Sequence, residues 1–162
     1  MKPSNNPKAF LDTTFLLPFF QLDIEVNGFS LEKFEAFLSR LDEVHLSELS
    51  IYEAKAKLFR LSRRNEGYTK ALESFGDNLT VLRDDETIHF HPYRQMDDSR
   101  FNLISGKDPS LDIFDVIIVA QAVDIGLLIT EDKEILNLRS RKSFAEDPEL
   151  KKLNIIPWKE LA

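Results

Sequence analysis

The chain has 162 residues, of which 43% are hydrophobic, so it is long enough for one hydrophobic core and too short for two ordinary domains. The absence of cysteine excludes disulfides, thiolate zinc sites and a cysteine nucleophile, and is typical of a protein in a reducing cytosol. A formal net charge of -7 argues against wholesale electrostatic capture of nucleic acid, although basic residues are concentrated locally. The apolar cluster over 15–20 is interrupted by Pro18 and is too short to span a bilayer, so we expect a cytoplasmic protein that does not enter the membrane.

The first half of the chain combines apolar runs with helical spacing of hydrophobic residues. Residues 1–7 are rich in proline and asparagine and are expected to form a flexible arm. Pro18 falls in the first turn of an expected helix, where its missing N–H is tolerated. The expected strands cover 9–11 and 44–46, and the expected helices cover 14–26, 31–41 and 50–64.

The second half of the chain begins with an unusual segment and then returns to α/β alternation. We expect residues 77–109 to be an atypical insert, in which period-two patterns near 80–82 and 87–91 indicate a strand pair or an extended segment. The remaining patterns predict helices over 112–124 and 132–138 and strands over 127–130 and 154–158. This order implies a single domain over 1–162 with an α/β layered fold and a mostly parallel central sheet.

Four acidic residues stand where an apolar strand gives way to a helix, or in the first turns of a helix: Asp12, Glu53, Asp115 and Asp132. Because the carboxyl ends of parallel strands and the helix N-termini that follow them meet at one edge of the sheet, we expect these carboxylates to share a pocket. Mutual repulsion should raise the pKa of some of them until a cation binds. Hard oxygen ligands without histidine or cysteine favour Mg²⁺ or Mn²⁺.

Each acid also has a structural explanation. Ser50 and Glu53 match a capping box, in which a serine and a glutamate side chain accept backbone N–H groups of the first helical turn. Negative charge at Asp112 and Asp115 would interact favourably with a helix dipole, and Asp132 would serve as an N-cap. Asp12 is the hardest to explain in this way, because the threonines after it could cap the following helix.

The four acidic motifs resemble those of the PIN-domain family, which includes VapC-type toxin ribonucleases and RNA-processing nucleases. The family opens with an apolar strand, an Asp and a hydroxyl residue, as in FLDTT at Asp12. Its later motifs are similar to SELSIYE ending at Glu53, DVIIVAQA beginning at Asp115 and TEDK around Asp132. The resemblance extends from Phe10 to Trp158 and implies a three-layer α/β/α fold.

The same resemblance implies a function. A member of this family is expected to be an Mg²⁺- or Mn²⁺-dependent endoribonuclease that hydrolyses RNA phosphodiester bonds, with one or two ions held by the four acids as catalytic residues. Thr13, Thr130 and Asp112 would orient these acids. Two further implications are a homodimer and a role as the toxin of a toxin–antitoxin pair, which would bind an antitoxin protein. The alternative is a catalytically inactive PIN-like module that binds RNA or protein.

Basic and histidine residues supply two secondary hypotheses. The candidates for contacting RNA phosphates are Lys55, Lys57, Arg60 and Arg63, although a basic helix face is more often plain solvated surface. His89 and His91 alternate in an expected strand, so both should point to one face. They are read either as partly exposed sheet residues or as metal ligands.

Overall fold

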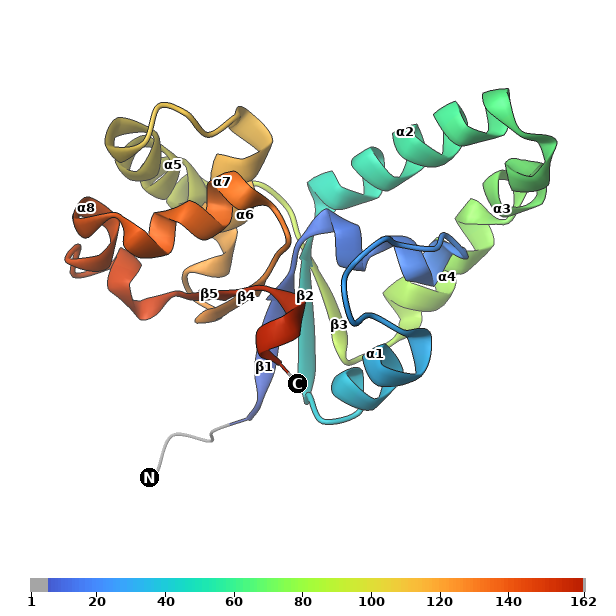
Figure 1. The fold of residues 1–162 in the computed structure, drawn as a ribbon, viewed down its shortest axis with the longest axis horizontal. Helices are drawn as coiled ribbons and strands as arrows, with labels where there is room; N and C mark the ends of the chain where they lie inside the picture. The colour runs from blue at the N-terminus through green and yellow to red at the C-terminus, as the bar shows by residue number, and fades with distance from the viewer. Residues whose placement is uncertain (1–5, 162) are drawn as a thin grey trace.

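The computed structural model describes residues 6–161 and contains a five-stranded sheet in which every neighbouring pair is parallel. The strand order is β3-β2-β1-β4-β5 (Figure 1). The strands are β1 (Lys8–Leu11), β2 (Glu43–Ser47), β3 (Ile88–His91), β4 (Leu127–Ile129) and β5 (Asn154–Ile156). Most of the expected N-terminal arm, residues 1–5, lies outside the described residues. Pro7 is already tied to the sheet, because its carbonyl accepts the N–H of Asp42 at 2.8 Å.

Helices cover both faces of this sheet, which gives the three layers of an α/β/α fold (Figure 1). One layer holds α1 (Leu31–Leu38), α2 (Glu48–Arg64), α3 (Thr69–Glu73) and α4 (Phe75–Asp84), and the other holds α5 (Gln95–Lys107), α6 (Ile113–Ala122), α7 (Lys133–Asn137) and α8 (Lys142–Ala145). Short 3-10 helices are η1 (Thr13–Phe15), η2 (Leu17–Phe20), η3 (Glu66–Tyr68), η4 (Leu138–Ser140), η5 (Leu150–Lys152) and η6 (Trp158–Glu160). Within residues 6–161, no helix combines the length and apolar character needed to cross a bilayer.

Strand β1 shows how the sequence builds two cores. Ala9 and Leu11 pack into the core under α1, α2 and α4, whereas Phe10 packs into the core under α5 and α6. This follows from the period-two alternation of side chains along a strand. A buried strand therefore carries apolar residues on both faces, which is the continuous apolar run that predicted a parallel sheet.

The helix expected over 14–26 is wrong. This segment forms η1 and η2 and then continues to Ser30 without a further helix or strand. Pro18 begins η2, as expected of proline in a first turn, but Gln21 adopts φ 63° and ends the element. Because a left-handed residue reverses the helical path, the chain cannot continue as one helix.

The strand pair expected within 77–109 is also wrong. Residues 80–82 lie in α4, where Phe75 and Leu82 are buried at helical spacing, and 95–107 form α5. Only 88–91 is extended, and this strand is β3 at one edge of the sheet. The apparent alternation near Val81 comes from three residues, which is too short a run to separate a strand from a helix.

Candidate functional site

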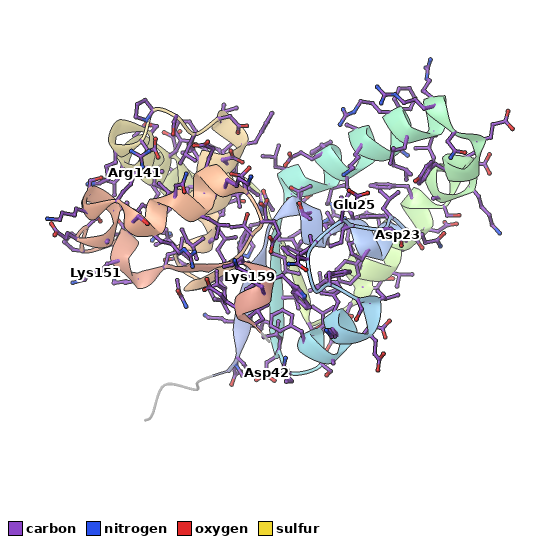
Figure 2. The ribbon with its side chains drawn as sticks, viewed as in Figure 1. Asp23, Glu25, Asp42, Arg141, Lys151 and Lys159 are labelled. Atoms are coloured by element: carbon purple, nitrogen blue, oxygen red, sulfur yellow. The ribbon has the colours of Figure 1, made fainter. Side chains whose placement is uncertain are left out.

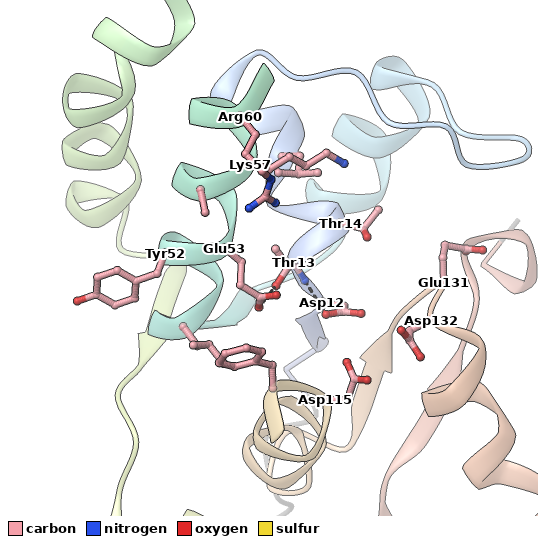
Figure 3. A pocket seen from close by; sticks show the side chains of 14 residues that line it. Asp12, Thr13, Thr14, Tyr52, Glu53, Lys57, Arg60, Asp115, Glu131 and Asp132 are labelled. Carbon is pink, nitrogen blue, oxygen red and sulfur yellow. Dashed lines mark hydrogen bonds between the residues drawn. The ribbon is translucent and has the colours of Figure 1, made fainter. Parts of the chain in front are cut away.

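The carboxyl-terminal edge of the sheet opens into a pocket of about 650 Å³ (Figure 3). All four acids identified in the sequence line it: Asp12 after β1, Glu53 on α2, Asp115 in the first turn of α6 and Asp132 before α7. Four segments distant in sequence therefore bring their carboxylates to one space. We call it the acid pocket.

Asp12 is held in place by two hydrogen bonds. Its Oδ1 accepts the backbone N–H of Thr13 at 2.7 Å, and its Oδ2 accepts the hydroxyl of Thr130 at 2.6 Å. Burial raises the pKa of the Asp12 carboxyl, and repulsion from Asp132 and Asp112 adds to this, although the two hydrogen bonds oppose it. Thr130, which is fully buried, also accepts the N–H of Asp132 at 3.0 Å. One hydroxyl thus links two acids of the pocket.

The capping box expected at Ser50 and Glu53 is wrong. Helix α2 begins at Glu48, two residues earlier than expected, with Ser47 as the N-cap accepting the N–H of Leu49 at 3.2 Å. Ser50 is buried and lies 2.8 Å from the hydroxyl of Thr13, which in turn donates to Glu53 Oε1 at 2.9 Å. Since this bond uses the Thr13 proton, Ser50 must donate to Thr13. The Glu53 carboxylate is therefore free of any capping role.

Burial also raises the pKa of Glu53, and the hydrogen bond from Thr13 opposes this shift. Repulsion from Asp12 and Asp112 raises the pKa further. Asp132 is an N-cap as expected, because it accepts the N–H of Ile135 at 3.0 Å. Asp112, expected within the first helical turn, is instead the N-cap of α6 and accepts the N–H of Asp115 at 2.9 Å. A cap engages only one of the two carboxylate oxygens. The second oxygen of Asp132 remains available to the pocket.

Asp115 is the most perturbed acid of the group. Burial and then repulsion from Asp132, Asp112, Asp12 and Glu53 raise its pKa to about 7. No donor within residues 6–161 makes a hydrogen bond to its side chain. Near neutral pH the pocket therefore retains a proton that a bound cation would displace.

The chemistry of these ligands fits a hard divalent ion. The side-chain groups of the pocket that can ligate a metal are carboxylate and hydroxyl oxygens, which suit Mg²⁺ or Mn²⁺ and not zinc. Within residues 6–161, no three histidine or acidic side chains lie close enough together, in their present rotamers, to hold a metal ion. Binding of a metal ion would therefore require rotation of the acidic side chains. The Asp115 side chain can rotate most easily, because no hydrogen bond holds it. Mg²⁺ retains several waters, so a few carboxylates suffice as its direct ligands.

Comparison with known proteins identifies the fold family. The family model described as PIN domain matches residues 9–140, a span that contains all four acids of the pocket. The chain belongs to the PIN-domain family. PIN domains are generally nucleases. No curated protein matches the chain.

A solved structure supports the PIN fold of this chain. It is the crystal structure of VapBC2 from Rickettsia felis bound to a DNA fragment from their promoter, and the two folds agree with a TM-score of 0.59. The match covers 93% of this chain and 98% of the other at 12% sequence identity. At so low an identity, the likeness concerns the fold.

The basic residues of α2 divide between two faces of the helix. Lys57 and Arg60 follow Glu53 at helical spacing and line the acid pocket (Figure 3). Lys55 instead lies over the ring of Phe75 at 4.7 Å, and Arg63 lies over the ring of Phe59 at 4.6 Å. The structure therefore brings two of the four candidate phosphate contacts to the acid pocket.

The three histidines of the chain gather on β2 and β3, away from the acids. The His45 and His89 rings are stacked at 4.9 Å, and His45 Nδ1 lies 2.7 Å from His91 Nε2. Burial, followed by the charges of His45 and Arg94, lowers the pKa of His91 to about 4. His89 and His91 thus share one face, as expected, and His89 is an exposed sheet residue.

Several pocket residues have no counterpart among the sequence candidates. Tyr52, Phe114 and Glu131 also line the acid pocket. Glu131 Oε1 accepts the backbone N–H of Trp158 at 2.7 Å, so this carboxylate anchors the C-terminal segment. Tyr52 precedes Glu53 directly and its side chain is 71% exposed, a position that helical spacing alone would assign to the solvated face.

Proposed function

We propose that this PIN domain is a divalent-metal-dependent ribonuclease that hydrolyses RNA phosphodiester bonds. The observation that carries the proposal is the convergence of four carboxylates on one pocket, where their proximity and burial raise the pKa of Asp115 to about 7. Such a group of acids is poorly stable without a cation. A cation that binds there is positioned at the edge where α/β folds carry their ligands.

In this proposal the pocket residues divide the work. Asp12, Glu53, Asp115 and Asp132 would hold Mg²⁺ or Mn²⁺, which would activate water and neutralise charge at the phosphate. Thr130 and Thr13 keep Asp12 and Glu53 in fixed orientations through the bonds of 2.6 and 2.9 Å. Asp112 keeps the first turn of α6, and with it Asp115, in place.

Lys57 and Arg60 extend the site along α2 toward Arg64, where a hollow of about 300 Å³ continues the basic face. Cationic side chains beside a cluster of carboxylates are suited to hold the phosphates that flank the scissile one. Their contacts would position the strand without reading its sequence. The exposed location of Lys57 and Arg60 leaves this face accessible to RNA.

We further propose that the protein is the toxin of a toxin–antitoxin pair and that it forms a homodimer. Support for the toxin–antitoxin pair comes from the likeness in fold to VapBC2, whose structure was solved bound to a promoter DNA fragment, whereas the homodimer follows only from the resemblance to the PIN-domain family. An antitoxin that covers the acid pocket would be expected to inhibit cleavage. Light scattering of the purified chain, alone and with the product of an adjacent open reading frame, measures both assemblies.

The nuclease proposal is tested by cleavage of end-labelled RNA with Mn²⁺, with Mg²⁺ and with EDTA. We expect cleavage only with a metal, and a loss of about 100-fold or more in Asp12→Asn and Asp115→Asn, since both residues touch the ion. Asp77→Asn is the matched control, because Asp77 is an exposed acid on α4 outside the pocket. Circular dichroism checks that each variant is folded.

Two results would redirect the assignment. Undiminished cleavage in both Asn variants would place the active site elsewhere. No cleavage, together with no heat of Mn²⁺ binding at millimolar concentration, would favour the noncatalytic RNA- or protein-binding module.

A further inference from the structure

A second groove, of about 390 Å³, adjoins the acid pocket and shares Leu49 and Tyr52 with it. Leu49 and Tyr52 on α2 form one wall, and Ile117 and Gln121 on α6 form the other. The segment His91–Tyr93, which begins at the last residue of β3, closes the far end. We call this space the Tyr52 groove. In Figure 3 the Tyr52 ring points away from the four carboxylates, so this side chain stands between the two spaces.

Gln121 lines the Tyr52 groove and carries an unpartnered acceptor. Its side chain is only 2% exposed, and its Nε2 donates to the carbonyls of His91 at 3.2 Å and Pro92 at 3.3 Å. Because a carboxamide oxygen cannot donate, these two bonds fix which end of the amide faces the loop. Oε1 is buried, and no donor within residues 6–161 reaches it. A buried acceptor without a partner is costly, so its presence beside a groove indicates a ligand that donates a hydrogen bond.

His91 presents a second acceptor, and its tautomer follows from a chain of hydrogen bonds. Glu43 lies 2.7 Å from His45 Nε2, and a carboxylate can only accept, so His45 carries its proton on Nε2. Because burial lowers the pKa of His45, its ring is neutral at pH 7 and its Nδ1 is an acceptor, so His91 Nε2 must donate to it across 2.7 Å. His91 Nδ1 is left with a free lone pair. Two residues that line the groove, Gln121 and His91, therefore each carry an acceptor atom without a partner among the described residues.

The charge of the groove is compatible with a polyanion nearby. Glu48, its one acidic lining residue, is held by Arg83 through two bonds of 2.8 and 2.9 Å. Leu49, Tyr52 and Ile117 supply an apolar and aromatic surface. An aromatic ring with an adjacent acceptor is the combination that binds an unpaired nucleobase.

We propose that the Tyr52 groove binds one unpaired base of the RNA strand, beside the phosphate that enters the acid pocket. The base stacks on Tyr52 and, by displacing the side chains that now close off Gln121 Oε1, donates its exocyclic amine to that oxygen. The strand then runs from Lys57 and Arg60, past the acids, to the groove. The site prefers adenine, cytosine and guanine over uracil, which has no exocyclic amine. This inference rests on the proposed ribonuclease function and adds a base-binding subsite to it.

The first test measures binding without cleavage. Fluorescence anisotropy of a short single-stranded RNA in EDTA is compared for the wild-type chain, Tyr52→Ala, Tyr52→Phe and Phe59→Ala. We expect about tenfold weaker binding for Tyr52→Ala and little change for Tyr52→Phe, which keeps the ring. Phe59→Ala is the matched control, since Phe59 is an exposed aromatic on the same helix and lines neither space. Repulsion from the acids is the same in all four proteins.

The second test identifies the base. An abasic nucleotide is moved along the RNA, and one position should weaken wild-type binding about as much as Tyr52→Ala does. At that position Tyr52→Ala should cause no additional loss, because both changes remove the same contact. Replacing adenine there by purine, or guanine by inosine, removes the exocyclic amine and should weaken binding about fivefold.

The outcomes separate this inference from the nuclease proposal. If Tyr52→Ala binds as tightly as wild type while the protein still cleaves RNA with Mn²⁺, the base site is overturned and the nuclease stands. If base binding follows Tyr52 but no metal supports cleavage, the nuclease proposal fails and the base site stands. Equal binding of purine and adenine would remove the role of Gln121. An antitoxin that occupies the groove while RNA binds elsewhere would overturn the base site.

Discussion

Two groups of acidic residues in this protein behave in opposite ways. In the acid pocket, burial and mutual repulsion raise the pKa values of Asp12, Glu53 and Asp115. Beside α5, Arg100 binds Asp124 through two bonds of 2.7 and 2.8 Å and Glu149 through one of 2.8 Å. The bonds to Arg100 lower the pKa of Asp124.

The difference lies in the partner that each group has. The acids beside α5 are neutralised by an arginine of the same chain, which is itself only 7% exposed. Charged side chains such as Lys151 lie instead at the periphery of the same layer (Figure 2). The pocket acids are held by hydroxyl and backbone donors and have no cationic partner among the described salt bridges. The first arrangement stabilises the fold, whereas the second stores repulsion that an external cation can relieve.

Among variants that test this difference between the acid pocket and the acids beside α5, we expect the largest effect from Thr130→Val. This change keeps the shape of the side chain and removes the hydroxyl between Asp12 and Asp132. We expect Mn²⁺ affinity and cleavage to fall by about 10- to 100-fold, as is usual for residues that orient metal ligands. Calorimetry and the cleavage assay measure it. Thr80→Val is the control, since its hydroxyl bonds only the Gly76 carbonyl on exposed α4. Equal losses in both variants would count against a special role for Thr130.

On the α5 side, Arg100→Met should destabilise the fold by about 2 kcal/mol, measured by urea unfolding. A fully buried pair would cost more, but the Asp124 and Glu149 side chains are 48% and 46% exposed and regain water. Arg139→Met, which breaks the exposed pair with Glu160, should cost under about 1 kcal/mol. If the two variants lose equal stability, the α5 network is ordinary surface.

The pH dependence of metal-free stability should have opposite signs in the two groups. The folded-state pKa of Asp115 is raised to about 7, so its contribution is fully present below pH about 4 and is lost as the pH rises through 7. We expect Asp115→Asn to raise the Tm by about 3 °C at pH 8 and to leave it unchanged at pH 4. Asp124 has a lowered pKa, so its contribution is present at neutral pH and is lost on acidification.

Asp124→Asn should accordingly lower the Tm at pH 8. Scanning calorimetry in EDTA follows both variants. Adding Mn²⁺ should raise the Tm of the wild type more than that of Asp115→Asn. A lower Tm for Asp115→Asn at pH 8 would show that the pocket acids do not repel one another.

The smallest effect concerns the basic face of α2. Lys57→Gln should reduce the salt dependence of single-stranded RNA binding by about 0.7 in the slope of log affinity against log salt, the value for one lost phosphate contact. Lys55→Gln should leave the slope unchanged, because this lysine lies over Phe75 on the other side of the helix. Titrations by anisotropy at several salt concentrations measure both. An equal slope change in the two variants would show that position on α2 does not matter.

Elements with long periodic patterns were predictable from sequence. The core strands and α1, with Ser30 as its N-cap, follow from hydrophobic spacing and capping chemistry alone. The segments that failed depend on tertiary context: Gln21 takes a left-handed conformation that no local pattern requires, and residues 80–82 join a helix because Phe75 and Leu82 face the core. Short apolar runs do not distinguish these states.

For the site, topology was the informative principle. The convergence of Asp12, Glu53, Asp115 and Asp132 follows once the order of strands and helices is known. Sequence could not show that Ser50 bonds Thr13 and not the helix terminus, because that contact joins residues 37 positions apart. Nor could it show the Tyr52 groove, whose walls come from α2, α6 and the segment after β3.

The most direct test of the central claim is the anomalous diffraction of a crystal soaked in Mn²⁺. We expect a peak inside the acid pocket, with carboxylate oxygens of Asp12 and Asp115 within about 2.5 Å of the ion. The carboxylates of Glu53 and Asp132 should contact the ion directly or through one water. A peak outside the acid pocket would contradict the proposed metal site. So would an empty acid pocket at Mn²⁺ concentrations high enough to fill surface sites elsewhere on the molecule.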